Sequence, residues 1–262
     1  MRHPEGHVSS EIEHGIATIE FFHPSSNSLP ANILDDLAKT INELGTNNRV
    51  HVIILRSAGN EVFCSGSSLN ELSAISNVKE GKKFFNGFAN VINEMRKCKK
   101  FILCRVQGKT IGGGIGLIAA SDYAFTVKSS ETDKHSIKLS ELTIGIGPFV
   151  VGPAIERKIG TSCYQQLAID ATNWRSAEWG KTHGLFSEVH NNEFEMDSAI
   201  TTLAEKLAHY SPDAMAQLKK VFWQGTEDWD TLLATRAEIS ANLIVGDFPR
   251  VAIAKLLGKA IV

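Results

Sequence analysis

Gly112-Gly113-Gly114 is a turn whose backbone could take part in chemistry. The triplet follows residues 101–106, a run typical of a strand, and precedes a helix predicted from about Ile115. Glycine has no Cβ, so a ligand can approach its backbone closely, and the first amides of a helix have no intrahelical partner. Such a turn favours an oxygen that carries negative charge. By itself, the segment is equally consistent with a turn that needs glycine for its backbone angles.

Residues 63–69 (FCSGSSL) form a second turn of this kind, because an amide again lies beside a glycine before a predicted helix. Two amides from separate strand-turn-helix junctions can bind one oxygen rigidly. The two turns together therefore predict an oxyanion hole.

Two nucleotide-binding motifs fail on inspection. The tripeptide Gly108-Lys109-Thr110 could end a phosphate-binding loop, but Leu103 stands where that loop needs its first glycine. Residues 114–119 match G-x-G-x-x-A, yet the preceding strand ends well before the glycines and the match lies in mid-chain. We therefore do not expect a nucleotide fold.

The composition favours one compact enzyme with a small-molecule substrate. The chain has 262 residues, 43% of them hydrophobic, which suffices for one full-sized core. Lysine plus arginine (27) nearly balances aspartate plus glutamate (29), so charge gives no reason to expect nucleic acid or a membrane surface as a partner. No apolar run approaches the roughly 18 residues of a membrane span.

The four cysteines are scattered, and none forms a C-x-x-C pair. Their spacing predicts neither a disulfide framework nor a metal site, and it suits a reducing compartment. Residues 1–14 are polar and acidic, unlike a secretory signal. We therefore expect a cytoplasmic protein.

Strands and helices alternate through most of the chain. Runs typical of strands occupy residues 15–22, 50–55, 101–106 and 123–127, and a second glycine-rich turn, residues 142–148, precedes another helix. Near residue 193 the pattern changes, and only helices are expected beyond it. We predict an α/β core in residues 1–192 and a C-terminal helical region in residues 193–262.

Four ordered segments resemble the crotonase (enoyl-CoA hydratase/isomerase) superfamily. Residues 63–69 are similar to its F-x-x-G-A-D-[LI] motif, and residues 106–122 to V-x-G-x-x-x-G-G-G-x-x-L-x-x-x-x-D. Residues 139–148 are similar to F-x-x-P-E-[IT]-x-x-G-x-x-P, and residues 176–189 to S-A-x-E-A-x-x-x-G-L-V-x-x-V. The matches span most of the chain, which is thus identified as a member of that superfamily.

The resemblance implies a fold and a substrate. The fold would be a spiral of ββα units followed by a C-terminal helical trimerisation region, and the protein would be a homotrimer or a dimer of trimers. The substrate would be an acyl-CoA thioester, with coenzyme A as part of the substrate and with no separate cofactor or metal.

The resemblance also implies roles for particular residues. The amides of Ser67 and Gly113 would bind the thioester oxygen and stabilise its enolate, and Ser68 stands where the family usually has aspartate. The positions expected to bind substrate or coenzyme A are Cys64, Gly66, Ser68, Leu69, Gly112, Gly114, Gly116, Phe149 and Lys259.

One of the family's two acid/base carboxylates is missing. Gly116 occupies the position of the first, whereas Glu141 occupies the second, after Ser140 in place of proline. Hydration requires that a water be activated and that C2 be protonated. Two carboxylates can readily divide these two tasks. A double-bond shift needs one carboxylate that removes a proton from C2 and returns it at C4. We therefore predict a Δ3-Δ2 enoyl-CoA isomerase with Glu141 as its acid/base.

The segment after Glu141 supports an isomerase. Residues 140–142 and 146–149 resemble the N-E-T and P-F arrangement of mitochondrial-type enoyl-CoA isomerases. Phe149 stands where 3-hydroxyisobutyryl-CoA hydrolases and dienoyl-CoA isomerases have aspartate. Phe149, Val150 and Val151 would form an apolar wall, which raises the affinity of Glu141 for a proton.

Other functions stay open. A hydratase for a branched substrate such as 3-methylglutaconyl-CoA could use Glu141 with a substrate carboxylate or another side chain, and a decarboxylation could also form the enolate. Some crotonase relatives bind RNA or chromatin without catalysis, but the near-neutral charge argues against this here, residues 96–100 being the one compact basic cluster.

Several further residues have two interpretations each. Phe84, Phe85 and Phe88 could line an acyl tunnel, although such a stripe is more often core. Arg56, Lys255 and Lys259 could meet the phosphates of coenzyme A or be ordinary surface charges. The set His135, Glu131 and Asp133 could suggest a metal, but a solvated loop is favoured.

Overall fold

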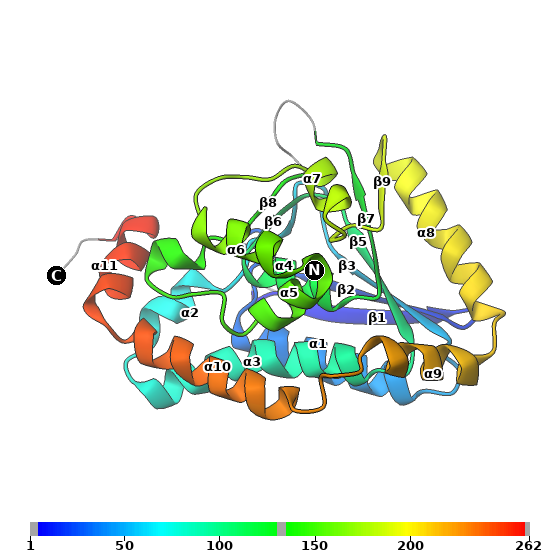
Figure 1. Ribbon diagram of the computed structural model, residues 1–262, viewed down its shortest axis with the longest axis horizontal. Helices are drawn as coiled ribbons and strands as arrows, with labels where there is room; N and C mark the ends of the chain where they lie inside the picture. Colours follow the sequence, from blue (N-terminus) through cyan, green and yellow to red (C-terminus); the bar gives the residue numbers. More distant parts are fainter. Residues whose placement is uncertain (1–4, 130–134, 260–262) are drawn as a thin grey trace.

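A computed structural model describes residues 5–129 and 135–259 of the chain (Figure 1). Its larger sheet has the strand order β1-β2-β3-β5-β7-β9. The first pair is antiparallel, and each later strand is parallel to its neighbour. The strands are β1 (His7–Glu13), β2 (Ile16–Phe22), β3 (Val52–Ser57), β5 (Phe101–Val106), β7 (Tyr123–Val127) and β9 (Glu188–His190).

A smaller parallel sheet contains β4 (Val62–Cys64), β6 (Lys109–Ile111) and β8 (Ile137–Lys138) in that order. The chain therefore places one strand in the larger sheet and the next in the smaller sheet, and then enters a helical segment. This happens three times, at β3-β4, β5-β6 and β7-β8. The predicted spiral of ββα units is confirmed. Each turn of the spiral ends with a helix beginning near the smaller sheet.

The helices that follow these pairs carry the elements of the site. They are α2 (Leu69–Ala74) and α3 (Val78–Lys97) after β4, α4 (Gly113–Ala120) after β6, and the 3₁₀ helix η1 (Glu141–Ile144) with α5 (Gly152–Ile159) after β8. Next come α6 (Thr161–Ile169) and α7 (Ala177–Thr182). Beyond β9 the described elements are α8 (Glu193–Ala208), α9 (Pro212–Phe222), α10 (Trp229–Ile244) and α11 (Asp247–Leu256).

Helix α3 lies between α1 (Ala31–Thr46) and α10, as Figure 1 shows. The buried stripe of α1, Ile33, Leu34, Leu37, Ile41 and Leu44, is the one that its 3.6-residue spacing predicts. The phenylalanines of α3 belong to the same core as Ile53 and Ile102 of the larger sheet. These contacts fix α3 and α10 along one side of the molecule.

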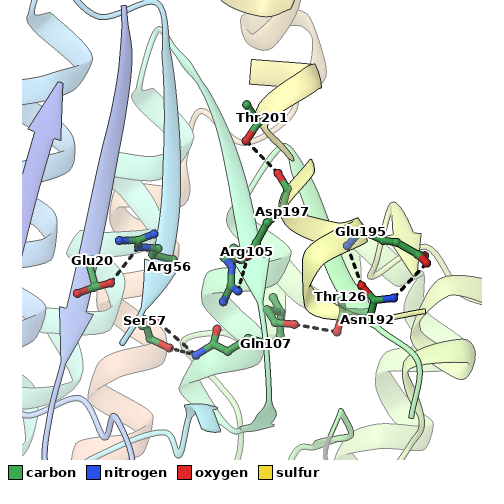
Figure 2. A network of polar contacts seen from close by, with 11 residues as sticks. Glu20, Arg56, Ser57, Arg105, Gln107, Thr126, Asn192, Glu195, Asp197 and Thr201 are labelled. Carbon is green, nitrogen blue, oxygen red and sulfur yellow. Dashed lines mark hydrogen bonds and ion pairs between the residues drawn. The ribbon is translucent and has the colours of Figure 1, made fainter. Parts of the chain in front are cut away.

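Helix α8 covers the other face of the larger sheet. Val52, Leu103 and Phe125 alternate with the residues that face α3, and they pack against Met196 and Ile200 of α8. Arg105 of β5 holds the same helix by two hydrogen bonds to Asp197, of 2.5 and 2.9 Å (Figure 2). The sheet is therefore buried on both faces, as parallel strands require.

A buried ion pair ties α9 to the end of α4. The side chain of Lys219 is 2% exposed, and its Nζ lies 2.7 Å from Oδ2 of Asp122. The same oxygen accepts a hydrogen bond of 2.7 Å from the Ile102 N–H, and Lys219 also donates to the Lys100 carbonyl at 2.8 Å. The pair thus links the C-terminal helices to the helix that the glycine triplet opens.

Lys219→Met should lower the free energy of unfolding by about 3 to 5 kcal/mol, because it leaves the Asp122 carboxylate buried without its cation. Asp122→Asn in the same chain should recover a large part of the loss. Urea unfolding measures both changes. The control is Lys97→Met, which breaks a half-exposed pair with Asp230 and should change stability by less than about 1 kcal/mol. Equal losses of stability in Lys219→Met and Lys97→Met would contradict the assignment of a buried ion pair to Lys219 and Asp122.

Candidate active site

A cavity opens where the two glycine turns, η1, α3 and α10 meet. Its volume is about 310 Å³, including the space at its mouth. Among the residues predicted to function, Ser67, Gly113, Glu141 and Phe149 all line it. The remaining lining residues are Phe85, Phe88, Ile146, Gly147, Pro148, Val150, Val151 and Ser240. The structure therefore brings the predicted oxyanion amides and the predicted carboxylate to one cavity.

The two turns lie against each other. Gly66 has a φ of +84°, and a Cβ at that position would lie 3.5 Å from the Gly113 nitrogen and 3.0 Å from the Ile111 oxygen. Leu29 donates to the Gly66 carbonyl at 2.8 Å and accepts from the Ser68 N–H at 3.4 Å, so the Ser67 N–H between them points away from Leu29.

The amides of Ser67 and Gly113 have no acceptor in the part of the chain that the structure describes. Within residues 5–129 and 135–259, neither N–H donates a hydrogen bond to a backbone or side-chain atom. Gly113 is the first residue of α4, where an amide has no intrahelical partner. Both donors line the cavity. A negatively charged oxygen in the cavity would satisfy donors that the protein leaves available.

Each glycine of the triplet has a different neighbour that excludes a side chain. A Cβ on Gly112, whose φ is +54°, would lie 2.9 Å from Oε1 of Glu141. On Gly113 it would lie 2.3 Å from a ring carbon of Phe88, and on Gly114 it would lie 2.6 Å from Cβ of Cys64. The triplet is therefore required by space as well as by backbone angle.

Glu141 is the first residue of η1 and lies beside the Gly112 backbone. Its Oε2 is buried and accepts no hydrogen bond from the described residues. Burial raises the pKa of this carboxyl to about 7, and the hydrogen bond to its own backbone amide opposes the shift only in part. A carboxyl of this pKa can accept and return a proton near neutral pH.

Gly116 does not line the cavity, and the space beside it is filled. A Cβ on Gly116 would lie 2.6 Å from Cγ1 and 2.8 Å from Cβ of Val151. Val151 belongs to the apolar wall that the sequence predicts, together with Phe149 and Val150, and all three line the cavity. A second carboxylate is therefore absent from this position, and the valine occupies the room that it would need.

The remaining residues of the first turn support it from outside the cavity. Cys64 is fully buried, which raises the pKa of its thiol to about 12, and its sulfur accepts from the Gly66 N–H at 3.3 Å. Ser68 caps α2 by accepting from the Glu71 N–H at 3.3 Å, so the serine performs the capping that an aspartate could also perform. Leu69 begins α2 and packs against the core.

The phenylalanines of α3 divide between the two interpretations. Phe85 and Phe88 line the cavity, whereas Phe84 packs edge-on against both of them, with ring centroids 5.4 and 6.0 Å apart. All three are at most 5% exposed. The two phenylalanines that line the cavity and the one that packs behind them therefore form one continuous layer.

The basic candidates lie away from this cavity. Arg56 is paired with Glu20 at 2.9 Å across β2 and β3 (Figure 2). Lys259 donates to the Ser73 hydroxyl at 3.3 Å and lines a separate groove between α2 and α11, and Lys255 is exposed at the end of α11.

Two further expectations from the sequence concern a metal site and a membrane span. Glu131 and Asp133 lie outside the described residues, and within those described there is no group of three or more His, Cys, Asp or Glu side chains suited to a metal ion. In the same part of the chain, no helix combines the length and apolar character of a membrane span.

Tyr164 and Ser240 belong to the site but were not predicted from the sequence. The Tyr164 hydroxyl donates to the Pro148 carbonyl at 3.3 Å, and it fits because residue 152 is glycine, where a Cβ would lie 2.3 Å from that hydroxyl. Ser240 reaches the cavity from α10 and is 1% exposed. The available signal for Ser240 was a polar residue within the apolar stripe of a helix.

Comparison with known proteins agrees with this architecture. The model of the family described as enoyl-CoA hydratase/isomerase matches residues 11–244. The chain belongs to the enoyl-CoA hydratase/isomerase family. It is thus a crotonase-superfamily enzyme that acts on acyl-CoA thioesters.

Its relatives carry different reaction names. The chain is 31% identical over 214 residues to the peroxisomal Delta(3,5)-Delta(2,4)-dienoyl-CoA isomerase of Arabidopsis thaliana, covering 77% of this chain and 74% of that protein. It is 29% identical over 204 residues to the mitochondrial methylglutaconyl-CoA hydratase of Homo sapiens, covering 77% of this chain and 58% of that protein. The names alone do not separate isomerase from hydratase.

Solved structures confirm the fold. An enoyl-CoA hydratase from Bacillus halodurans aligns with a TM-score of 0.85 over 95% of this chain and 99% of its own, at 20% identity. An enoyl-CoA hydratase from Mycobacterium avium subsp. paratuberculosis K-10 aligns with a TM-score of 0.80 over 96% of both chains, at 17% identity. The crotonase fold predicted from the motifs is therefore correct.

Gly116→Ala should lower the free energy of unfolding by about 1 to 3 kcal/mol, because its methyl group would overlap the Val151 side chain in a packed core. Val151→Ala should also destabilise, by leaving a cavity. The double variant should lose less than the sum of the two single losses, because each change relieves the other. Chemical denaturation of the four proteins measures this coupling, and strictly additive losses would show that the two residues do not compete for space.

Glu141→Gln should stabilise the protein at alkaline pH. Folding raises the pKa of this carboxyl from 4.5 to about 7, so its contribution to stability is fully present below 4.5 and is lost as the pH rises through 7. Glutamine stays neutral throughout. Relative to wild type, the variant should gain up to about 3 kcal/mol between pH 4.5 and pH 8. Urea unfolding across this range tests the trend, and a difference that does not change with pH would refute it.

Proposed function

We propose that this enzyme is an enoyl-CoA isomerase that moves a double bond from Δ3 to Δ2 through a thioester enolate. One observation carries the proposal: Glu141 is the single carboxyl among the residues that line the cavity, burial raises its pKa to about 7, and the amides of Ser67 and Gly113 line the same cavity. The room that a second carboxylate would need beside Gly116 is filled by Val151.

The enolate is stabilised by the two turns. The N–H groups of Ser67 and Gly113 donate to the thioester oxygen, whose negative charge grows as the proton leaves C2. The donors are held by the β4–α2 and β6–α4 junctions, so they need little reorganisation when the charge appears. In a cavity with apolar walls, their field is screened less than it would be in water.

Glu141 moves one proton and ends in its starting state. Its carboxylate takes a proton from C2 of the 3-enoyl thioester, and the electron pair enters the enolate. The neutral acid then gives the proton to C4 of the conjugated intermediate, which closes the double bond between C2 and C3 and restores the thioester carbonyl. No water is consumed, so one carboxyl suffices.

Hydration and dienoyl isomerisation have less support. Hydration needs a group that activates water while C2 is protonated, and the space beside Gly116, where a second carboxylate would stand, is filled by Val151. The dienoyl-CoA isomerases resemble this chain but have an aspartate where Phe149 lines the cavity. The second candidate is a hydratase for a branched substrate, favoured by the likeness to the human protein named methylglutaconyl-CoA hydratase.

Purified enzyme should convert 3-enoyl-CoA to 2-enoyl-CoA and hydrate crotonyl-CoA slowly. Glu141→Gln should lower the isomerisation rate by about 10²- to 10⁴-fold, the usual contribution of a positioned acid/base. Mass spectrometry of products formed in H₂¹⁸O separates the outcomes, since isomerisation adds no solvent oxygen. Rapid hydration of crotonyl-CoA together with an untouched 3-enoyl-CoA would overturn the isomerase proposal, and labelled product from a methylglutaconyl thioester would favour the second candidate.

The isomerisation should depend on a single ionisation near pH 7. The base must be ionised, so kcat/KM should rise with pH and level off above the pKa of Glu141, which is about 7. A single group of this pKa predicts activity about 30-fold lower at pH 5.5 than at pH 8.5. An activity that stays flat over this range would show that Glu141 is not the base.

We further propose a cytoplasmic homo-oligomer, a trimer or a dimer of trimers. Large apolar side chains remain exposed on the C-terminal helices of the single chain, which supports burial between subunits. They include Leu218, Val221 and Phe222 on α9, and Phe248, Val251 and Leu256 on α11.

A further inference from the structure

The apolar stripe of α10 contains two polar residues one turn apart. Leu233, Ala237 and Ile244 are buried along this stripe. Arg236 and Ser240 stand on the same face, at spacing i and i+4. The arginine is half-buried and the serine is fully buried. A cation and a hydroxyl on the inner face of a helix require an explanation.

Contacts between α3 and α10 place the Arg236 position level with the cavity, although Arg236 itself is not one of the residues that line it. The two helices run antiparallel, because Lys82 pairs with Glu238 at 3.2 Å while Lys97 pairs with Asp230 at 2.6 Å. Arg236 lies between these two pairs along α10. The corresponding stretch of α3 contains Phe85 and Phe88, which line the cavity.

Ser240 brings a hydroxyl to the same cavity as Glu141. Its Oγ lies 3.4 Å from the Arg236 carbonyl, which is long for a hydrogen bond between two oxygens. The hydroxyl can therefore turn toward a stronger acceptor. Ser240 and Arg236 would reach such an acceptor from one face of one helix.

The Arg236 guanidinium has no anionic partner within residues 5–129 and 135–259. In the described part of the chain, no carboxylate pairs with it and no side chain accepts from it. Five other arginines do have carboxylate partners: Arg56, Arg96, Arg105, Arg175 and Arg250. Burying a cation costs hydration, and an anionic partner offsets that cost. A ligand that carries an anion would supply the missing partner.

The Arg236 charge also acts on Tyr164, whose hydroxyl contacts the cavity wall at Pro148. Burial raises the pKa of its hydroxyl, the Glu141 charge raises it further, and the Arg236 charge opposes both. The same hydroxyl donates to Pro148, a residue of the cavity wall. Arg236 and Glu141 thus shift the pKa of one group in opposite directions.

We propose that Arg236 and Ser240 bind a carboxylate on the acyl group, so the natural substrate is a thioester of a dicarboxylic acid. A guanidinium presents two parallel N–H donors that match the two oxygens of a carboxylate. Ser240 adds a third donor from the cavity side. The inference rests on the proposed function in one respect, that the acyl chain occupies the cavity of Glu141.

Binding of saturated thioesters tests the receptor without requiring any reaction. Isothermal titration would compare glutaryl-CoA with pentanoyl-CoA, and adipoyl-CoA with hexanoyl-CoA, so that each pair has the same chain length. Wild type should bind the carboxylated member at least about 10-fold more tightly. Arg236→Gln should weaken carboxylated thioesters by about 10- to 100-fold and leave neutral ones nearly unchanged.

Two further variants act as matched controls. Arg49→Gln makes the same change at an exposed arginine between α1 and β3, and it should behave as wild type. Arg236→Lys keeps the charge but loses the two-pronged geometry, so its preference should be intermediate. If Arg236→Gln does not fold, Arg236→Lys and Ser240→Ala carry the test, and each should reduce the preference for the carboxylated member of a pair.

The outcomes separate this inference from the proposed reaction. Equal binding of neutral and carboxylated thioesters by wild type would overturn the receptor, as would an equal loss of both in Arg236→Gln. A strong carboxylate preference in an enzyme that fails to isomerise would refute the isomerase while leaving the receptor intact. An active isomerase that binds neutral and carboxylated thioesters equally would refute the receptor and leave the isomerase proposal intact.

Discussion

Burial of one carboxyl in an apolar wall is the constraint on which the site depends. Glu141 has a buried oxygen that finds no hydrogen-bond partner among the described residues, and burial raises the pKa of its carboxyl to about 7. The position is unfavourable for an ionised group and has to be maintained by the surrounding packing. η1 begins at Glu141 directly after β8, and the Gly112 backbone fits against its carboxylate. Groups that are unfavourable for folding but suited to proton transfer at neutral pH are typical of active sites.

The spiral of ββα units brings this carboxyl to the two amides. β4, β6 and β8 are neighbours in the smaller sheet, so the segments after their C-terminal ends meet at one edge. The first segment carries Ser67, the second carries Gly113 and the third carries Glu141. Because the strands are short and their register is fixed by parallel pairing, three residues far apart in sequence converge without a long loop. Both sheets and the helices that bury them therefore position these three residues at one edge of the smaller sheet.

The sequence predicts those parts of the site that depend on local motifs, and it misses those that depend on distant partners. The glycine triplet, Glu141 and the apolar wall were found because each lies in a short pattern with its own physical meaning. β1 was not predicted, because a polar edge strand such as His7–Glu13 lacks the apolar alternation of a buried one. Tyr164 and Ser240 acquire their roles only through packing against Gly152 and α3, and that packing is not encoded near either residue.

The proposed carboxylate receptor is compatible with a base at Glu141. A guanidinium close to Glu141 would stabilise its ionised form and lower its pKa. The pKa of Glu141 is instead governed by burial and by its own backbone amide, whereas the Arg236 charge acts on Tyr164. Arg236 comes from α10, whereas Glu141 comes from the β8–α5 connection. The carboxyl can thus remain a base near neutral pH, while the arginine remains available to an anion on the substrate.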